Sequence, residues 1–220
     1  MVTEAVLFDM DGVLTDSEPV INAAAIAGLR EFGVASQPED FAPFVGMGED
    51  RYIGGVAEKY GMTYVPEMKR RVYEIYLEIL PGMVRAFPGV HELLGRLRSL
   101  GVRLAVASSA DRVKVEANLG AIHVDLAWFD TIVVGEDVEN KKPAPDSYLC
   151  AARRLGLSAE VCCVVEDAVN GVLSAKNAGM RCVAVEQSFP AERLLPSGPD
   201  IIRPGVAQIT LADLEVAPRG

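Results

Sequence analysis

The chain has 220 residues, enough for one domain or for one domain with a small insert. Half of the residues are hydrophobic and 24% are charged, a composition that excludes an intrinsically disordered chain. The formal net charge of −10 argues against nucleic-acid binding through a broad positive surface, so any anion site must be built locally.

Five short apolar segments rich in β-branched residues predict strands that are buried on both faces. They cover residues 5–8, 103–107, 131–134, 161–165 and 182–185. Between the later ones lie helical patterns over 90–100, 111–119, 146–155 and 168–178, each followed by a glycine that can end the helix. This alternation predicts an α/β fold, a Rossmann-like doubly wound parallel sheet.

One region breaks the alternation, because residues 18–79 contain only helical patterns, at 19–32, 50–60 and 66–80. A block of about four helices after the first strand predicts an inserted α-helical cap domain. We expect the cap to cover residues 17–81 and the core domain to cover 1–16 and 82–220. Polar and turn-rich segments at the two boundaries could act as hinges.

Ligands of an open α/β sheet bind at the carboxyl ends of its strands, so the residues that follow each strand are the candidate site. Asp9 and Asp11 follow the first strand, with Gly12 allowing a sharp turn. Two adjacent carboxylates are costly unless a cation neutralises them, and Mg²⁺ prefers such oxygen ligands. An ordinary acidic turn stays open as the alternative.

Three further segments carry polar residues in corresponding places. Ser108 and Ser109 follow the second strand, where hydroxyl and backbone N–H groups suit an anion, although a helix cap would look the same. Lys142 lies in a loop stiffened by two prolines. Glu166 and Asp167 follow the fourth strand and supply a second carboxylate pair.

Together, the pattern Asp9-x-Asp11-Gly12, Ser108, Lys142-Pro143 and Glu166-Asp167 resembles the four-motif signature of the haloacid dehalogenase superfamily. The helical insert is similar to the subclass that includes β-phosphoglucomutase and phosphoglycolate phosphatase. A second likeness, carried by residues 44–49, 106–112 and 180–182, is to the phosphatase-like domain of a plant thylakoid protein.

The resemblance implies a role for each motif residue. Asp9 would be the nucleophile that forms an aspartyl-phosphate, and Asp11 the general acid and base. Mg²⁺ would be held by Asp9, Asp11 and Asp167 with support from Glu166, while Ser108, Ser109 and Lys142 bind the phosphoryl oxygens. Gly46, Glu49 and Arg51 of the cap would set substrate specificity, although a turn before a helix explains the same residues.

The same resemblance separates three hypotheses. The presence of Asp11 disfavours dehalogenation. The mutase relatives carry a histidine and an arginine where this chain has Ile21 and Glu49, which favours a phosphatase acting on a small phosphorylated metabolite such as a sugar phosphate. A β-phosphoglucomutase-like mutase and a regulatory or binding module with little catalysis remain as alternatives.

The remaining features predict a soluble, cytoplasmic, monomeric protein without nucleic-acid or membrane partners. The N-terminus has no basic segment with a cleavage site, and no apolar stretch approaches the roughly 20 residues that span a bilayer. The four cysteines lack metal-site spacing and are predicted to be core residues. His91 and His123 are interpreted as structural or surface residues.

Overall fold

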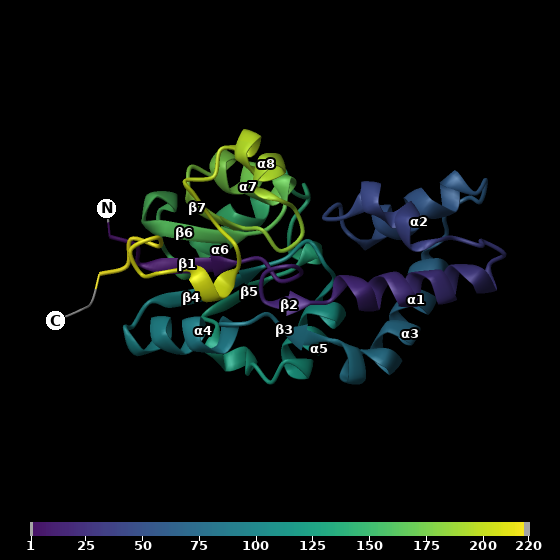
Figure 1. Ribbon diagram of the computed structural model, residues 1–220, viewed down its shortest axis with the longest axis horizontal. Helices are drawn as coiled ribbons and strands as arrows, with labels where there is room; N and C mark the ends of the chain where they lie inside the picture. Colours follow the sequence, from purple (N-terminus) through teal and green to yellow (C-terminus); the bar gives the residue numbers. More distant parts are fainter. Residues whose placement is uncertain (1, 218–220) are drawn as a thin grey trace.

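The computed structural model describes residues 2–217 and contains a six-stranded parallel sheet (Figure 1). Its strand order is β5-β4-β1-β6-β7-β8, with β1 near the centre and paired on both sides. The bounds are β1 Ala5–Phe8, β4 Arg103–Ala107, β5 Thr131–Val133, β6 Cys162–Glu166, β7 Arg181–Val185 and β8 Ile201–Arg203.

Helices cover both faces of this sheet. Helices α4 (Val90–Ser99) and α5 (Arg112–Ala121) lie on one face, and α6 (Asp146–Leu155), α7 (Val169–Asn177) and α8 (Ala191–Leu194) lie on the other (Figure 1). Successive residues of β1 therefore enter different cores, Val6 and Phe8 on the α4 side and Ala5 and Leu7 on the α6 side. The predicted doubly wound α/β fold is confirmed.

A helical segment leaves the sheet after β1 and extends beyond its carboxyl edge (Figure 1). It contains α1 (Glu18–Glu31), the 3-10 helix η1 (Pro38–Phe44), α2 (Glu49–Lys59) and α3 (Pro66–Met83). Helices α1 and α3 pack so closely that a Cβ added at Gly28 would lie 2.8 Å from Val72 Cγ2. The antiparallel strands β2 (Thr15–Asp16) and β3 (Arg85–Ala86) join the segment to the sheet.

Several elements differ from the sequence-based prediction. Strands β2, β3 and β8 were not predicted, because two or three residues are too few for a periodic pattern. Gly120 lies inside α5 rather than after it. The other short 3-10 helices are Leu126–Trp128, Gly135–Asp137, Ala159–Val161, Leu195–Ser197 and Val206–Gln208.

Two further features concern membrane-spanning helices and the cysteines. Within residues 2–217, no helix combines the length and the apolar character that crossing a bilayer requires. All four cysteines are buried as free thiols, as expected for core residues.

Candidate active site

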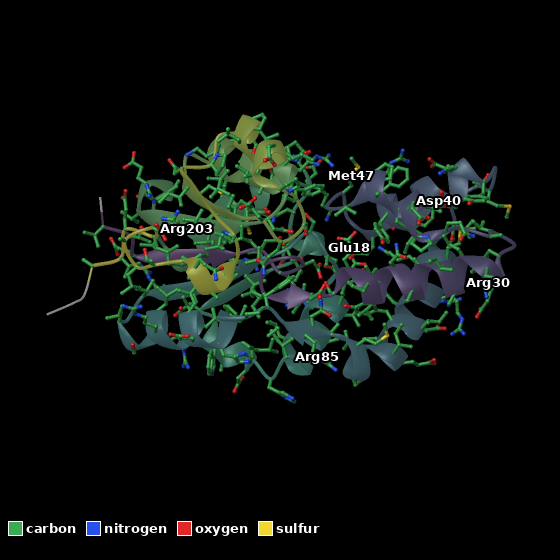
Figure 2. The ribbon with its side chains drawn as sticks, in the orientation of Figure 1. Glu18, Arg30, Asp40, Met47, Arg85 and Arg203 are labelled. Carbon is green, nitrogen blue, oxygen red and sulfur yellow. The ribbon has the colours of Figure 1, made fainter. Side chains whose placement is uncertain are left out.

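All predicted site residues except Arg51 meet in a cleft between the carboxyl ends of β1, β4 and β6 and the helical segment. The cleft has a volume of about 740 Å³ out to its open mouth. Glu18, the first residue of α1, lines the cleft and lies at the junction of the sheet and the helices (Figure 2). Asp9, Asp11, Ser108, Ser109, Lys142, Glu166 and Asp167 also line the cleft.

A buried lysine joins the first and fourth motifs. Lys142 Nζ donates to Asp9 Oδ1 at 2.6 Å, to Glu166 Oε1 at 2.7 Å and to Tyr148 Oη at 2.9 Å. Burial lowers the pKa of Lys142, but the charges of Asp9 and Glu166 outweigh it, so the pKa lies above its ordinary value. Lys142 is therefore a fixed positive charge beside the carboxylate of Asp9.

Asp9 lies at the end of the central strand and is buried. Burial raises the pKa of its carboxyl to about 7, although Lys142 opposes the shift, while Glu166 and Asp11 add to it. Lys142 contacts only Oδ1, and within residues 2–217 Oδ2 has no hydrogen-bond partner. One oxygen of Asp9 is thus held in place and the other is left for a ligand.

The fourth motif contributes two carboxylates with different surroundings. Glu166 accepts from Lys142 and Tyr148 through Oε1 and from the backbone N–H groups of Asp167 and Ala168 through Oε2, at 2.8 and 2.9 Å. Its oxygens are therefore occupied by protein donors, so Glu166 fixes the loop rather than pointing a free oxygen into the cleft.

Asp167 instead lies against the loop after β1. A Cβ at Gly12, whose φ is +85°, would collide with Asp167 Oδ2 and would lie 2.7 Å from Ser188 Oγ. Burial raises the pKa of Asp167 well above its ordinary value, and the negative charges of Glu166 and Asp9 add to the shift. Gly12 therefore permits the close approach that brings a second carboxylate toward Asp9.

Asp11 points toward α5. Lys114 Nζ donates to its Oδ2 at 2.8 Å, while Asn118 Nδ2 donates to Oδ1 at 3.1 Å. Ser17 also donates to Oδ1. These partners were not predicted, although Lys114 and Asn118 are four residues apart on the helix that follows Ser108 and so share one face.

The second motif provides Ser108 at the end of β4. Ser108 is buried, and its Oγ accepts from the backbone N–H of Ala110 at 3.0 Å. Ser108, Ser109 and Ala110 all line the cleft opposite the loop that carries Asp167. The turn after β4 thus presents a hydroxyl close to the start of α5, an arrangement that suits an anion.

The helical segment contributes Gly46 and Glu49 to the cleft wall, but Arg51 is not brought there. Arg51 is exposed, pairs with Glu58 at 2.8 Å and lies over the ring of Phe44, which itself lines the cleft. Glu49, the first residue of α2, is buried and accepts from Lys114 at 2.9 Å. Lys114 thereby links Glu49 of the helical segment to Asp11 of the first motif.

No group of three or more His, Cys, Asp or Glu side chains is arranged around a common metal position in the described residues. His91 is part of the structure, since its ring contacts the backbone oxygen of Ile122 at 2.8 Å, and it does not line the cleft.

Comparison with known proteins places these motifs in a family. Residues 6–185 match the family of haloacid dehalogenase-like hydrolases. The chain is 44% identical to the chloroplast protein SUPPRESSOR OF QUENCHING 1 of Arabidopsis thaliana over 96% of its own length, and it spans 20% of that protein. It is 31% identical to a phosphorylated carbohydrates phosphatase of Thermotoga maritima, over 94% of the chain and 93% of the relative.

Solved structures agree with the fold. CbbY from Rhodobacter sphaeroides in complex with phosphate superimposes with a TM-score of 0.88 at 28% identity, covering 98% of this chain and 100% of that one. A point mutant of the same protein in complex with xylulose 1,5-bisphosphate gives a TM-score of 0.86 at 28% identity, covering 97% of this chain and 99% of that one.

Proposed function

Because the chain belongs to the haloacid dehalogenase-like hydrolase family, we propose that it is a magnesium-dependent phosphatase of a small phosphorylated metabolite, a sugar phosphate, with Asp9 as nucleophile. The family predicted from the four motifs is confirmed, and with it the class of phosphoric monoester hydrolases. The substrate, the metal and the reaction steps are the proposal.

The observation that carries the proposal is the buried contact between Lys142 and Asp9 at the end of the central strand. A carboxylate is a weak nucleophile that must be ionised and aimed in line with the bond that breaks. Lys142 holds Oδ1 of Asp9 while Oδ2 is left unpaired within the described chain. This arrangement suits attack by Oδ2 on phosphorus and stabilises the added negative charge.

The carboxylates of the cleft are also suitable ligands for Mg²⁺. The ion is bound in phosphoryl-transfer sites by one or two carboxylates together with waters and substrate oxygens. Asp9 and Asp167 are two buried carboxylates whose pKa values are raised mainly by burial and further by neighbouring negative charge, and a divalent cation would stabilise their charged forms. When bound, the ion would offset negative charge on the phosphoryl oxygens. We propose Asp9 and Asp167 as side-chain ligands, with the backbone oxygen of Asp11.

Asp11 is the proposed acid and base. In the first step Asp9 Oδ2 forms a bond to phosphorus, the ester P–O bond breaks, and Asp11 gives its proton to the leaving alcohol oxygen. In the second step water attacks the aspartyl-phosphate, Asp11 accepts the water proton, and inorganic phosphate leaves. Lys114, Asn118 and Ser17 orient Asp11 between these steps. Ser108 donates to a phosphoryl oxygen, and Lys142, whose N–H groups donate to Asp9, Glu166 and Tyr148, attracts the phosphoryl oxygens through its charge.

We further propose that residues 17–81 act as a cap over this cleft and that residues 1–16 and 82–220 form the core domain. The short β2–β3 ribbon is the connection between the two. A Cβ at Gly46 would lie 3.9 Å from Ala168, and Glu49 reaches Lys114, so the segment touches the core on both sides of the cleft. Closure of such a cap would keep water away from the phosphoryl group.

Hydrolysis is favoured over isomerisation by the cleft wall. Ile21 and Glu49 both line the cleft, in the positions where the mutases of the family carry a histidine and an arginine. An isoleucine cannot transfer a proton to a sugar hydroxyl. Because the chain spans only 20% of SUPPRESSOR OF QUENCHING 1, the activity of that whole protein is not carried over.

The test is release of inorganic phosphate from a panel of sugar phosphates with Mg²⁺. We expect turnover of at least one member by the native chain and loss of turnover in Asp9→Asn. Asp125→Asn is the matched control, because Asp125 is exposed and lies outside the cleft lining. Folded native protein that releases no phosphate from any member would contradict the proposal and favour a regulatory module.

A further inference from the structure

Within residues 2–217, one carboxylate oxygen of Glu49 has no hydrogen-bond partner. Glu49 is 7% exposed and lines the cleft; its Oε1 accepts from Lys114, while its Oε2 is buried and receives no hydrogen bond from the described chain. Leaving a buried carboxylate oxygen unsatisfied is unfavourable, so such an atom marks a place where a donor is expected from outside the protein.

The position of Glu49 identifies which part of a substrate would supply that donor. Lys114 Nζ lies 2.8 Å from Asp11 Oδ2 and 2.9 Å from Glu49 Oε1, so one ammonium group separates the two carboxylates. Under the proposed function, Asp11 protonates the leaving oxygen. Glu49 therefore lies on the side of the leaving alcohol, away from Lys142 and the phosphoryl oxygens.

Within residues 2–217, the wall of the cleft offers no unpaired cationic side chain to a second phosphate group. Of the cationic side chains in the described residues, only Lys114 and Lys142 line the cleft, and each already contacts two carboxylates. The nearby cation Lys69 is paired with Asp50 and Asp111 and does not line the cleft. Glu18 adds a further negative charge to the wall, so an anionic group on the leaving alcohol would be repelled.

We infer that Glu49 is a specificity-determining residue that accepts a hydrogen bond from a donor on the leaving alcohol, so that the substrate is a phosphomonoester with one phosphate and a nearby hydroxyl or ammonium group. This inference rests on the proposed function, because that function places the phosphate at Asp9. It distinguishes this chain from CbbY, whose structure contains xylulose 1,5-bisphosphate, a ligand with two phosphates.

Binding to the Asp9→Asn protein with Mg²⁺ tests the inference without turnover. Calorimetry would compare xylulose 5-phosphate with xylulose 1,5-bisphosphate, and glycerol 3-phosphate with propyl phosphate, which lacks the hydroxyls. We expect the donor-bearing monophosphate to bind at least about 10-fold more tightly in each comparison. Equal affinities, tighter binding of the bisphosphate, or no binding of any ligand would overturn the inference.

Second substitutions in the same Asp9→Asn background identify the donor. A hydroxyl donor predicts that Glu49→Gln, which keeps an acceptor oxygen, retains most of the preference and that Glu49→Leu loses it. An ammonium donor predicts that both lose the preference of 2-aminoethyl phosphate over ethyl phosphate. Glu39→Gln, an exposed site outside the cleft, should retain the preference. Unchanged preference in Glu49→Leu would overturn the assignment.

The two proposals fail in different ways. Preferential binding that depends on Glu49, without phosphate release by the native protein, would refute the phosphatase and leave the ligand assignment intact. Phosphate release without any dependence on Glu49 would do the reverse. Thermal unfolding of each variant separates both results from a loss of folded protein.

Discussion

Replacement of Lys142 by methionine should cost more stability than most single substitutions. Lys142 is buried, and its ammonium group donates to two carboxylates and one phenol within 2.9 Å. Methionine fills a similar volume but leaves Asp9 and Glu166 as neighbouring buried charges without a counter-charge. Removing one partner of a buried ion pair typically costs about 3–5 kcal/mol, and we expect a loss in that range.

The assay is urea unfolding followed by circular dichroism, without metal and at neutral pH. Lys141→Met is the matched control, because the neighbouring lysine is exposed and should change stability by less than about 1 kcal/mol. In Glu166→Gln the Asp9–Lys142 pair persists, so its loss should be smaller than that of Lys142→Met. A loss below about 1 kcal/mol for Lys142→Met would refute the view that Lys142 compensates the buried charges of Asp9 and Glu166.

Three other perturbations follow from the structure. Gly12→Ala should abolish phosphate release, because its φ is +85° and the added Cβ would collide with the carboxylate of Asp167; activity near the native level would contradict that contact. Arg51→Ala should change kcat/KM less than about 3-fold, since the guanidinium pairs with Glu58 outside the cleft; a loss above about 10-fold would return Arg51 to the substrate site. Without metal, the free energy of unfolding should rise as pH falls from about 8 to about 6. Folding raises the pKa of Asp9 from its ordinary 3.8 to about 7, so the folded state binds the proton more tightly than the unfolded state does. Asp9 contributes a slope of at most about 1.4 kcal/mol per pH unit, and Asp167 acts in the same direction. Urea titration at each pH measures the dependence of unfolding free energy on pH, which Asp9→Asn should flatten.

The parallel sheet could be predicted because its inner strands carry a strong local signal. Strand β1 is apolar throughout and fully buried, so its pattern does not depend on what packs against it. Strand β8 is only partly buried and mixes Ile201 and Ile202 with Arg203, which gives no such pattern. The first residues after β1, β4 and β6 were predictable for the same reason, since strand ends fix where they meet.

The contacts around Asp11 could not be predicted in the same way. Asp11, Glu49 and Lys114 come from three separate segments, and their meeting depends on how the helical segment packs against α5. The position of Arg51 also depends on that packing, because Glu49 and Tyr52 of α2 line the cleft while Arg51, between them in sequence, does not. Sequence periodicity describes one helix at a time and does not contain this information.

The hydrogen-bond partners of Glu166 are a second example of contacts that the sequence did not predict. The sequence suggested that Glu166 supports a metal, but the structure surrounds its carboxylate with Lys142, Tyr148 and two backbone N–H groups. A Cβ at Gly171 would also collide with this carboxylate, which explains a glycine within α7. Tyr148 is on α6, so its contribution appears only once that helix is placed against the sheet.

The most direct measurement is mass spectrometry of the native chain, quenched in acid during turnover of a substrate identified by the phosphate-release panel with Mg²⁺. The mechanism predicts that the peptide containing Asp9 gains the mass of one phosphoryl group, and that this adduct is missing from Asp9→Asn. Phosphate release by the native chain with the adduct on another residue, or with none at any quench time, would contradict Asp9 as the nucleophile.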